Sequence, residues 1–205
     1  MKIGRRFLLS PGETPSNKAP EETGGRIPIR LSPGKAFGSG LHETTVSCLE
    51  ALEGLGSLKN RSVLDVGTGT GILSLACLLL GARKVLAFDI DSGAARNCNR
   101  NAVLNQVSEQ LSVFQGTLES VTHSVDFDLV LANIHGDIIL KEAGRLAKHT
   151  REEGYLILSG LDYTDSRQAK TAMKEQGMEE VSVLFLEDFV TQVWRRPPGR
   201  LRTGP

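Results

Sequence analysis

The sequence predicts an α/β domain with a mostly parallel sheet of seven strands, helices on both faces and an antiparallel strand near the C-terminus. Three observations support this class. Between residues 62 and 176, short apolar runs alternate with stretches of helical periodicity. The run Val63–Val66 ends in closely spaced glycines that lead directly into an apolar helical pattern. Two strand-like runs, 181–186 and 190–194, are close enough to form a hairpin, so one of them is expected to run antiparallel to the others.

Composition excludes several function classes. Lys plus Arg and Asp plus Glu number 24 each in 205 residues, so the net charge is zero. This balance argues against a surface that coats nucleic acid, although it is compatible with a local basic patch. No apolar run approaches the roughly 18 residues of a membrane span, and the apolar run at the start is too short for a signal peptide. We therefore expect a cytoplasmic protein with no membrane partner.

The cysteines and histidines form no metal-site pattern. Cys48, Cys77 and Cys98 lie in helix-like stretches without a C-x-x-C pair, so we expect buried free thiols in a reducing compartment. The four histidines are scattered along the chain, at His42, His123, His135 and His149. No metal cofactor is predicted.

The two ends of the chain are weakly patterned. Residues 3–9 are compatible with a short strand, and Ser10–Gly25 contains three prolines, which indicates a loop. Ile27–Leu31 alternates apolar and polar residues, as an edge strand does. We therefore expect an N-terminal extension or linker at 1–31, a cofactor-binding domain at 32–196 and a disordered tail at 197–205.

The central elements follow from apolar spacing. Glycine-rich residues 32–45 lead into a helix in which Val46, Leu49 and Leu52 recur at helical intervals. The helix after the glycines of the first central strand is apolar almost all round, so it should be buried, and Gly81 should end it. Strands are expected at 62–66, 84–88, 111–115, 126–132 and 155–158, and helices at 71–80, 92–105, 137–149 and 165–176.

A glycine-rich turn after the first central strand is the strongest functional signal. Gly67, Gly69 and Gly71 lie between a strand and a helix, an order that presents backbone N–H groups and a helix N-terminus to a ligand. The dinucleotide fingerprint requires glycine at position 72, where this chain has Ile72, so NAD is disfavoured. Glycines let a ligand approach the backbone closely. The alternative is that they form only a tight strand–helix turn.

Two acidic residues make this turn more specific. Asp65 precedes the glycines, and Asp89 ends the next strand about twenty residues later. A carboxylate in that position can accept two hydrogen bonds from a ribose diol. The combination favours S-adenosylmethionine, which has an amino-carboxylate, a ribose and an adenine but no pyrophosphate. The alternative for Asp89 is a cap on the following helix, for which Asp91 is the better candidate.

Two further stretches are expected to reach the same pocket. The strand Phe127–Ala132 ends in Asn133 at the carboxyl edge of the sheet, where ligands of open α/β sheets bind. Asn133 is the candidate catalytic residue, because its side-chain oxygen can accept from an amine nucleophile or from the cofactor's amino group. The alternative is an ordinary turn residue. The second stretch is Phe37–Thr45, whose hydroxyls and helix start can close over the cofactor.

With these residues assembled, the sequence resembles the ribosomal protein L-eleven methyltransferase family from Leu31 to about Arg196. Residues 33–45 are similar to the family's P-G-x-A-F-G-T-G-x-H-x-T-T, and the stretches at 63–72, 89–91, 133–134 and 157–160 also fit. The resemblance implies a Rossmann-like class I methyltransferase that uses S-adenosylmethionine to methylate lysine side chains and an N-terminal amine of a ribosomal protein. By resemblance, the cofactor is contacted by Thr45, Gly67, Asp89 and Asn133, and flanked by Phe37. With the glycine turn, the full expected cofactor site is Phe37, Thr45, Asp65, Gly67, Gly69, Gly71, Asp89 and Asn133.

The sequence departs from the family pattern in three places. The family normally carries a separate N-terminal domain that holds the ribosomal protein, and residues 1–31 are too few for it. Ser39 replaces the usual threonine, and His135 and Gly136 follow where the family has Leu-Ala or similar. These departures leave the cofactor site intact but weaken the assignment of the substrate. Another lysine-bearing protein or a small amine is therefore an alternative acceptor.

The expected reaction is an in-line methyl transfer in which Asn133 orients the reacting ends, without an identified general base. One competing class is a module that binds the cofactor without turnover, against which Asn133 and the Phe37 loop argue. A NAD-dependent oxidoreductase is disfavoured because Tyr155 and Tyr163 have no catalytic neighbours in the sequence. Nucleic acid is not expected as the direct substrate, because the Asn133 motif lacks the aromatic residue that stacks a flipped base.

Overall fold

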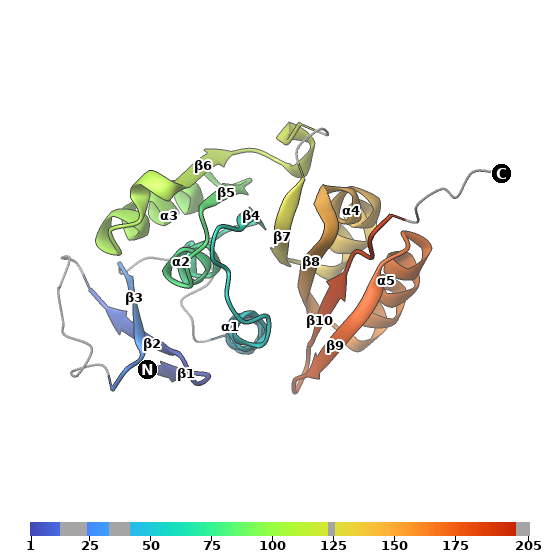
Figure 1. The fold of residues 1–205 in the computed structure, drawn as a ribbon, viewed down its shortest axis with the longest axis horizontal. Helices are drawn as coiled ribbons and strands as arrows, with labels where there is room; N and C mark the ends of the chain where they lie inside the picture. Colours follow the sequence, from blue (N-terminus) through green and yellow to red (C-terminus); the bar gives the residue numbers. More distant parts are fainter. Residues whose placement is uncertain (13–23, 33–41, 123–125, 200–205) are drawn as a thin grey trace.

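The computed structural model describes residues 1–12, 24–32, 42–122 and 126–199 (Figure 1). Its central strands are β4 (Ser62–Val66), β5 (Lys84–Asp89), β6 (Leu111–Gln115), β7 (Phe127–Asn133), β8 (Thr150–Leu161), β9 (Glu179–Phe185) and β10 (Val190–Arg195). They form one seven-stranded sheet with the order β6-β5-β4-β7-β8-β10-β9. The strand β10 is antiparallel to both of its neighbours, and the other pairs are parallel. The predicted fold class is confirmed.

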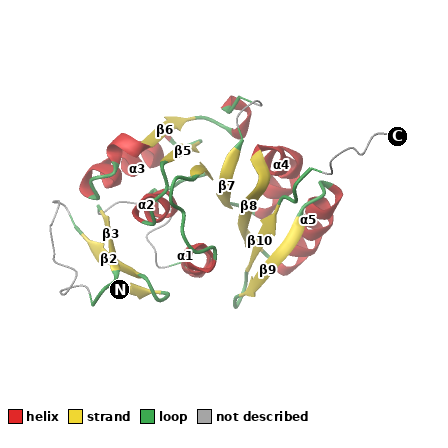
Figure 2. Ribbon diagram, viewed as in Figure 1, coloured by secondary structure: helices red, strands yellow, loops and turns green. Residues whose placement is uncertain are grey.

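Helices cover both faces of this sheet (Figure 2). The α-helices are α1 (Glu43–Gly54), α2 (Ile72–Leu79), α3 (Ser92–Leu104), α4 (Gly136–His149) and α5 (Tyr163–Glu175), and two short 3-10 helices are η2 (Ser108–Gln110) and η3 (Leu118–Ser120). One face packs against α1, α2 and α3, and the other against α4 and α5. Side chains of β4 alternate between the two faces, because Val63 packs in the apolar cluster under α1, α2 and α3, and Leu64 packs in the cluster under α4 and α5. Both residues are fully buried, as expected for a strand between two layers.

A small second sheet precedes the main one. Its strands are β1 (Lys2–Ile3), β2 (Phe7–Pro11) and β3 (Ile27–Leu31), of which β1 and β2 are antiparallel and β2 and β3 parallel. Where one strand was expected at 3–9, a turn intervenes, because Gly4 adopts φ 50° and the Glu53 carboxylate accepts from the next two backbone N–H groups. Phe7 is fully buried in the same apolar cluster as α1 and α2.

The N-terminal strand β3 is as expected, whereas most of the expected loop at 10–25 lies outside the described residues. The division of the chain at residues 31 and 196 stays a prediction. In the expected tail, residues 197–199 have no regular structure and 200–205 lie outside the described residues.

The strand β8 is longer than the apolar pattern predicts. The sequence predicts a strand at 155–158, but pairing begins at Thr150. Of the extra residues, Arg151, Glu152 and Glu153 are charged and exposed, so periodicity gives no signal for them. They are held by the chain end, since the Glu153 N–H donates to the Arg196 carbonyl at 2.8 Å and the Arg196 N–H donates to the Gly154 carbonyl at 2.9 Å.

The cysteines behave as the sequence predicts. Cys48, Cys77 and Cys98 are buried and unpaired. Burial raises the pKa of the Cys48 and Cys98 thiols to about 12, so both stay protonated at neutral pH. In the described ranges, no helix combines the length and apolarity needed to cross a bilayer.

Candidate functional site

A pocket of about 620 Å³ opens at the carboxyl edge of the sheet. It lies where β4 has β5 on one side and β7 on the other, which is the topological switch point at which open α/β sheets bind ligands. Its volume is within the roughly 300–1,000 Å³ of small-molecule sites. Residues from the ends of β4, β5 and β7, from η3 and α4, and from the loop between β9 and β10 line it.

The glycine turn adopts a backbone conformation that is strained for residues other than glycine. Gly67, Gly69 and Gly71 have φ angles of 71°, 55° and 83°. The N–H groups of Gly67 and Thr68 both donate to the Phe88 carbonyl at 3.0 Å, which fixes the turn to the end of β5. A Cβ at Gly67 would collide with Cγ2 of Ile134, the residue that follows β7. Glycine is therefore required at position 67 by both conformation and space.

Asp89 lies at the end of β5 and faces this turn. Its Oδ2 accepts from the Gly69 N–H at 2.9 Å, and its Oδ1 accepts from the Asp91 N–H at 3.0 Å. Each carboxylate oxygen can accept a further hydrogen bond. Asp91, as expected, caps α3 by accepting from the Gly93 N–H at 2.7 Å. Asp89 is thus oriented by backbone donors, and it lines the pocket with carboxylate oxygens that can accept further hydrogen bonds.

Asp65 lies beneath the turn and does not line the pocket in the described structure. It is buried, and its Oδ2 accepts from Thr68 Oγ1 at 2.7 Å and from Ser74 Oγ at 2.5 Å. Burial raises the pKa of the Asp65 carboxyl, against the opposing effect of these hydroxyl donors. Its position therefore indicates that Asp65 supports the turn from below.

Replacing Asp65 with alanine is expected to lower the free energy of unfolding by about 1–3 kcal/mol, because the buried hydroxyls of Thr68 and Ser74 lose their shared acceptor. Urea unfolding followed by circular dichroism measures the change. Ser74→Ala removes only one of the two donors and should cost less. Equal stability of the Asp65→Ala variant and the parent chain would contradict this supporting role.

Asn133 ends β7 and lines the pocket, half-buried. It pairs with Ser159 of β8, and the next residue of β8 is Gly160 with φ 82°. A Cβ at Gly160 would collide with the carbonyl oxygen of Ile134 and would lie 3.5 Å from the Asn133 Oδ1. Because Gly160 has no Cβ, β8 can lie close to the residues at the end of β7, and this close contact positions Asn133. His135 follows at the N-cap of α4, without a side-chain capping bond, and also lines the pocket.

The structure brings only part of the sequence-predicted site together. Gly67, Gly69, Asp89 and Asn133 line the pocket, whereas Gly71 is the N-cap of α2, where a Cβ would lie 2.5 Å from Cys98 Sγ. Phe37 lies outside the described residues.

Thr45 is fully buried in α1 and is not among the lining residues, although its neighbours His42 and Thr44 are. Its Oγ1 has no hydrogen-bond partner within the described part of the chain. Thr45 thus has an open bonding position behind the pocket wall. His42 could have been found from the H-x-T-T part of the signature in which it lies.

Several lining residues were missed by sequence reasoning. Phe88, Ile90 and Leu118 give the pocket apolar wall, and Phe189 approaches His42 with ring centroids 5.4 Å apart. Phe88 could have been predicted from the sequence, because it directly precedes Asp89. Phe189 has no local signal, because only the insertion of β10 between β8 and β9 brings it to the site.

The comparisons with known proteins agree with this geometry. The family model "Ribosomal protein L11 methyltransferase (PrmA)" matches residues 1–197. The ribosomal protein L11 methyltransferase of Bacillus pumilus is 38% identical over 196 residues, which are 96% of this chain and 61% of that protein. That of Heliobacterium modesticaldum is 38% identical, over 95% of this chain and 60% of its own. The chain thus spans about three fifths of the length of these relatives.

Solved structures give the same picture. A ribosomal protein L11 methylase from Lactobacillus delbrueckii subsp. bulgaricus superposes with a TM-score of 0.83 at 29% identity, covering 96% of this chain and 98% of that one. The 16S rRNA N2 G1207 methyltransferase of T. thermophilus, solved with AdoMet and guanosine, has a TM-score of 0.67 at 20% identity and covers 81% of this chain and 46% of its own. The second likeness shows a shared methyltransferase fold. Because the family model matches nearly the whole sequence, the chain belongs to the ribosomal protein L11 methyltransferase (PrmA) family.

Proposed function

We propose that the pocket at the carboxyl edge binds S-adenosylmethionine and that the chain transfers the methyl group to amino groups of ribosomal protein L11. The observation that carries the proposal is the Asp89 carboxylate, which is held by backbone donors beside a glycine turn at the switch point of the sheet. Family membership and the names of the relatives support ribosomal protein L11 as the acceptor. The cytoplasmic location of this reaction stays a prediction.

The lining residues fit the chemical parts of this cofactor. Asp89 offers acceptors for the two ribose hydroxyls. Phe88, Ile90 and Leu118 supply apolar surface for the adenine ring. Gly67 and Gly69 line the pocket without side chains of their own, so the methionine part can lie against the backbone.

The protein's contribution to the reaction is positioning. The bound cofactor supplies a methyl group on a sulfonium centre that is open to displacement. The acceptor amine, with a pKa near 10.4 when it is a lysine, must be neutral to attack, and it loses its proton to water or to a pocket carboxylate. The Asn133 Oδ1 then accepts a hydrogen bond from the neutral amine and aligns it. Closure of the site by His42 and Phe189 limits the access of water to the reacting atoms.

Replacing Asn133 with alanine is expected to lower the rate of methyl transfer by about 100-fold, because the amine loses its orienting acceptor. Cofactor affinity should change far less. The rate is measured by mass spectrometry of ribosomal protein L11 after incubation with enzyme and S-adenosylmethionine, and the affinity by calorimetry. Asn99→Ala, at an exposed position of α3, is the matched control.

This experiment also separates the competing functions. A parent chain that binds the cofactor but adds no methyl group to any offered amine is a binding module and contradicts the proposal. Methylation of a small amine with no methylation of L11 would support methyl transfer by this chain but contradict L11 as the acceptor. An Asn133→Ala variant as fast as the parent would remove Asn133 from the mechanism.

A further inference from the structure

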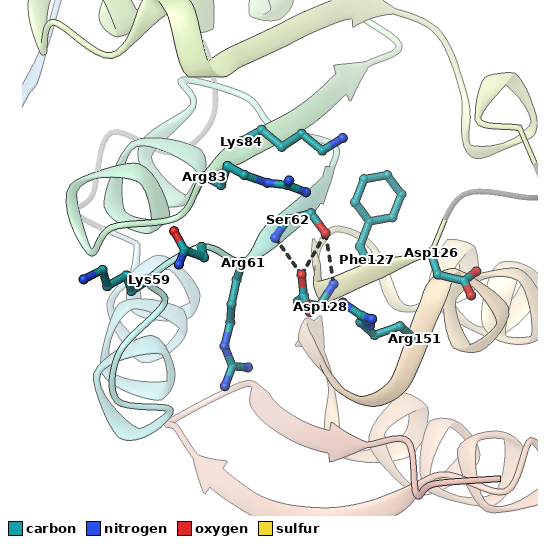
Figure 3. Close-up of a pocket in the computed structure, with 10 residues that line it drawn as sticks. Lys59, Arg61, Ser62, Arg83, Lys84, Asp126, Phe127, Asp128 and Arg151 are labelled. Carbon is teal, nitrogen blue, oxygen red and sulfur yellow. Dashed lines mark hydrogen bonds and ion pairs between the residues drawn. The ribbon is translucent and has the colours of Figure 1, made fainter.

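A second pocket, of about 490 Å³, lies at the opposite edge of the sheet, where the central strands begin (Figure 3). It shares no lining residue with the pocket at the carboxyl edge. Its residues come from the loop before β4, from the starts of β4, β5 and β7, and from the start of β8. None of these residues has a role in the proposed methyl transfer.

Positive charge is concentrated around this second pocket. Its lining contains five cationic side chains and two carboxylates, in a chain whose overall charge is zero. The cationic residues are Lys59, Arg61, Arg83, Lys84 and Arg151. This is the local basic patch that the balanced composition allows.

One of the two carboxylates is already neutralised. Asp128 accepts from the Ser62 N–H at 2.8 Å and pairs with Arg151 at 2.7 Å. Burial opposes the ionisation of Asp128, but these donors outweigh it and lower the pKa of the carboxyl. The second carboxylate, Asp126, is exposed. In the described ranges, the exposed cations Lys59, Arg83 and Lys84 form no ion pair, so their charge faces solvent.

The cations are spread along the sheet edge and do not converge on one point. Figure 3 shows Arg83 and Lys84 extending in the same direction from the start of β5, whereas Arg61 and Lys59 point to other sides. The Arg61 guanidinium lies over the Tyr155 ring, 5.6 Å from its centroid. From β5 to β8 is three strand spacings, or about 14 Å. A compact anion would meet few of these charges, whereas an extended polyanion can meet most of them.

We propose that this edge binds the phosphate backbone of single-stranded RNA. A nucleic-acid backbone carries one charge per nucleotide, which suits cations spaced along an edge. Arginine forks bind phosphate in bidentate fashion, and Arg83 is exposed and forms no ion pair within the described ranges. The aromatic side chain in the described lining, Phe127, is buried and cannot stack on a base. Binding should therefore be independent of sequence and strongly dependent on salt.

The test is a charge reversal of the two parallel cations. Arg83→Glu/Lys84→Glu is compared with the parent chain for binding of a fluorescein-labelled single-stranded oligoribonucleotide of about 12 nucleotides. At about 50 mM salt the variant should bind at least about tenfold more weakly, with a log–log salt slope smaller by about 0.7 for each lost phosphate contact. Arg167→Glu/Lys174→Glu, with the same charge change on exposed positions of α5, should bind as the parent does. Unchanged affinity for S-adenosylhomocysteine shows that each variant is folded.

Four results would overturn the proposal. The first is that the parent chain does not bind the oligoribonucleotide, and the second is that the α5 control variant binds it as weakly as the Arg83→Glu/Lys84→Glu variant. The third is that polyglutamate competes as strongly as unlabelled RNA. The fourth is that inorganic phosphate displaces the oligoribonucleotide more than chloride does at equal ionic strength. The last two would identify an acidic polypeptide or a compact anion as the occupant.

Discussion

Replacing Asp89 with alanine is expected to weaken the binding of S-adenosylhomocysteine by at least about 100-fold. Two hydrogen bonds from ribose hydroxyls to a charged acceptor are worth about 1.5–3 kcal/mol each, and about 1.4 kcal/mol corresponds to a factor of ten. The variant also loses the acceptor of the Gly69 N–H, which holds the turn against β5. Isothermal titration calorimetry gives the dissociation constants directly.

The control for this variant is Asp91→Ala, two residues along the same loop. Asp91 caps α3 and does not line the pocket, so its loss should cost about 1 kcal/mol of stability and leave the affinity unchanged. Asp89→Asn keeps one oxygen acceptor and should fall between the parent and Asp89→Ala. An equal loss of affinity in the Asp89 and Asp91 variants would show that loop order, and not a ribose contact, controls binding.

Replacing Gly67 with alanine is expected to reduce methyl transfer by at least about 100-fold, because a small misplacement of positioned groups costs this much. The new Cβ would collide with Cγ2 of Ile134, which is close to the backbone and cannot swing aside. Ile134 is the residue after Asn133, so the collision moves the end of β7 as well as the turn. The positive φ adds a strain of about 1–2 kcal/mol. Initial rates of L11 methylation and urea unfolding measure the two effects.

Gly56 provides a control that separates strain from collision. Its φ is 76°, and a Cβ there would meet nothing within 4 Å. Gly56→Ala should therefore show the strain alone, with normal methyl transfer. The double variant Gly67→Ala/Ile134→Ala lacks Cγ2 at position 134 and should recover part of the lost stability. If Gly67→Ala lowers the rate of methyl transfer and the stability no more than Gly56→Ala does, the close contact between the turn and Ile134 is not important for function.

The parts of the fold that the sequence predicted are those with local causes. The run Val63–Val66 is buried at every position and mostly apolar because a central strand is covered on both faces, and the glycines after it have no Cβ to oppose positive φ. Such features need no knowledge of distant residues. The polar start of β8 failed as a prediction because its pairing partner, Arg196, lies more than forty residues away in the chain, as the hydrogen bond from the Glu153 N–H shows.

The sequence by itself predicted the class of ligand, since a glycine turn without Gly at position 72 and an acid ending the next strand favour a nucleoside without a pyrophosphate. Only the tertiary structure decided which residues line the pocket. It placed Asp65 below the turn and brought Phe189 to the pocket from the loop before β10. It also gathered Arg83 and Arg151 at the far edge. Strand order brings Phe189, Arg83 and Arg151 to these places, because it sets neighbours across the sheet that residue spacing along the chain does not encode.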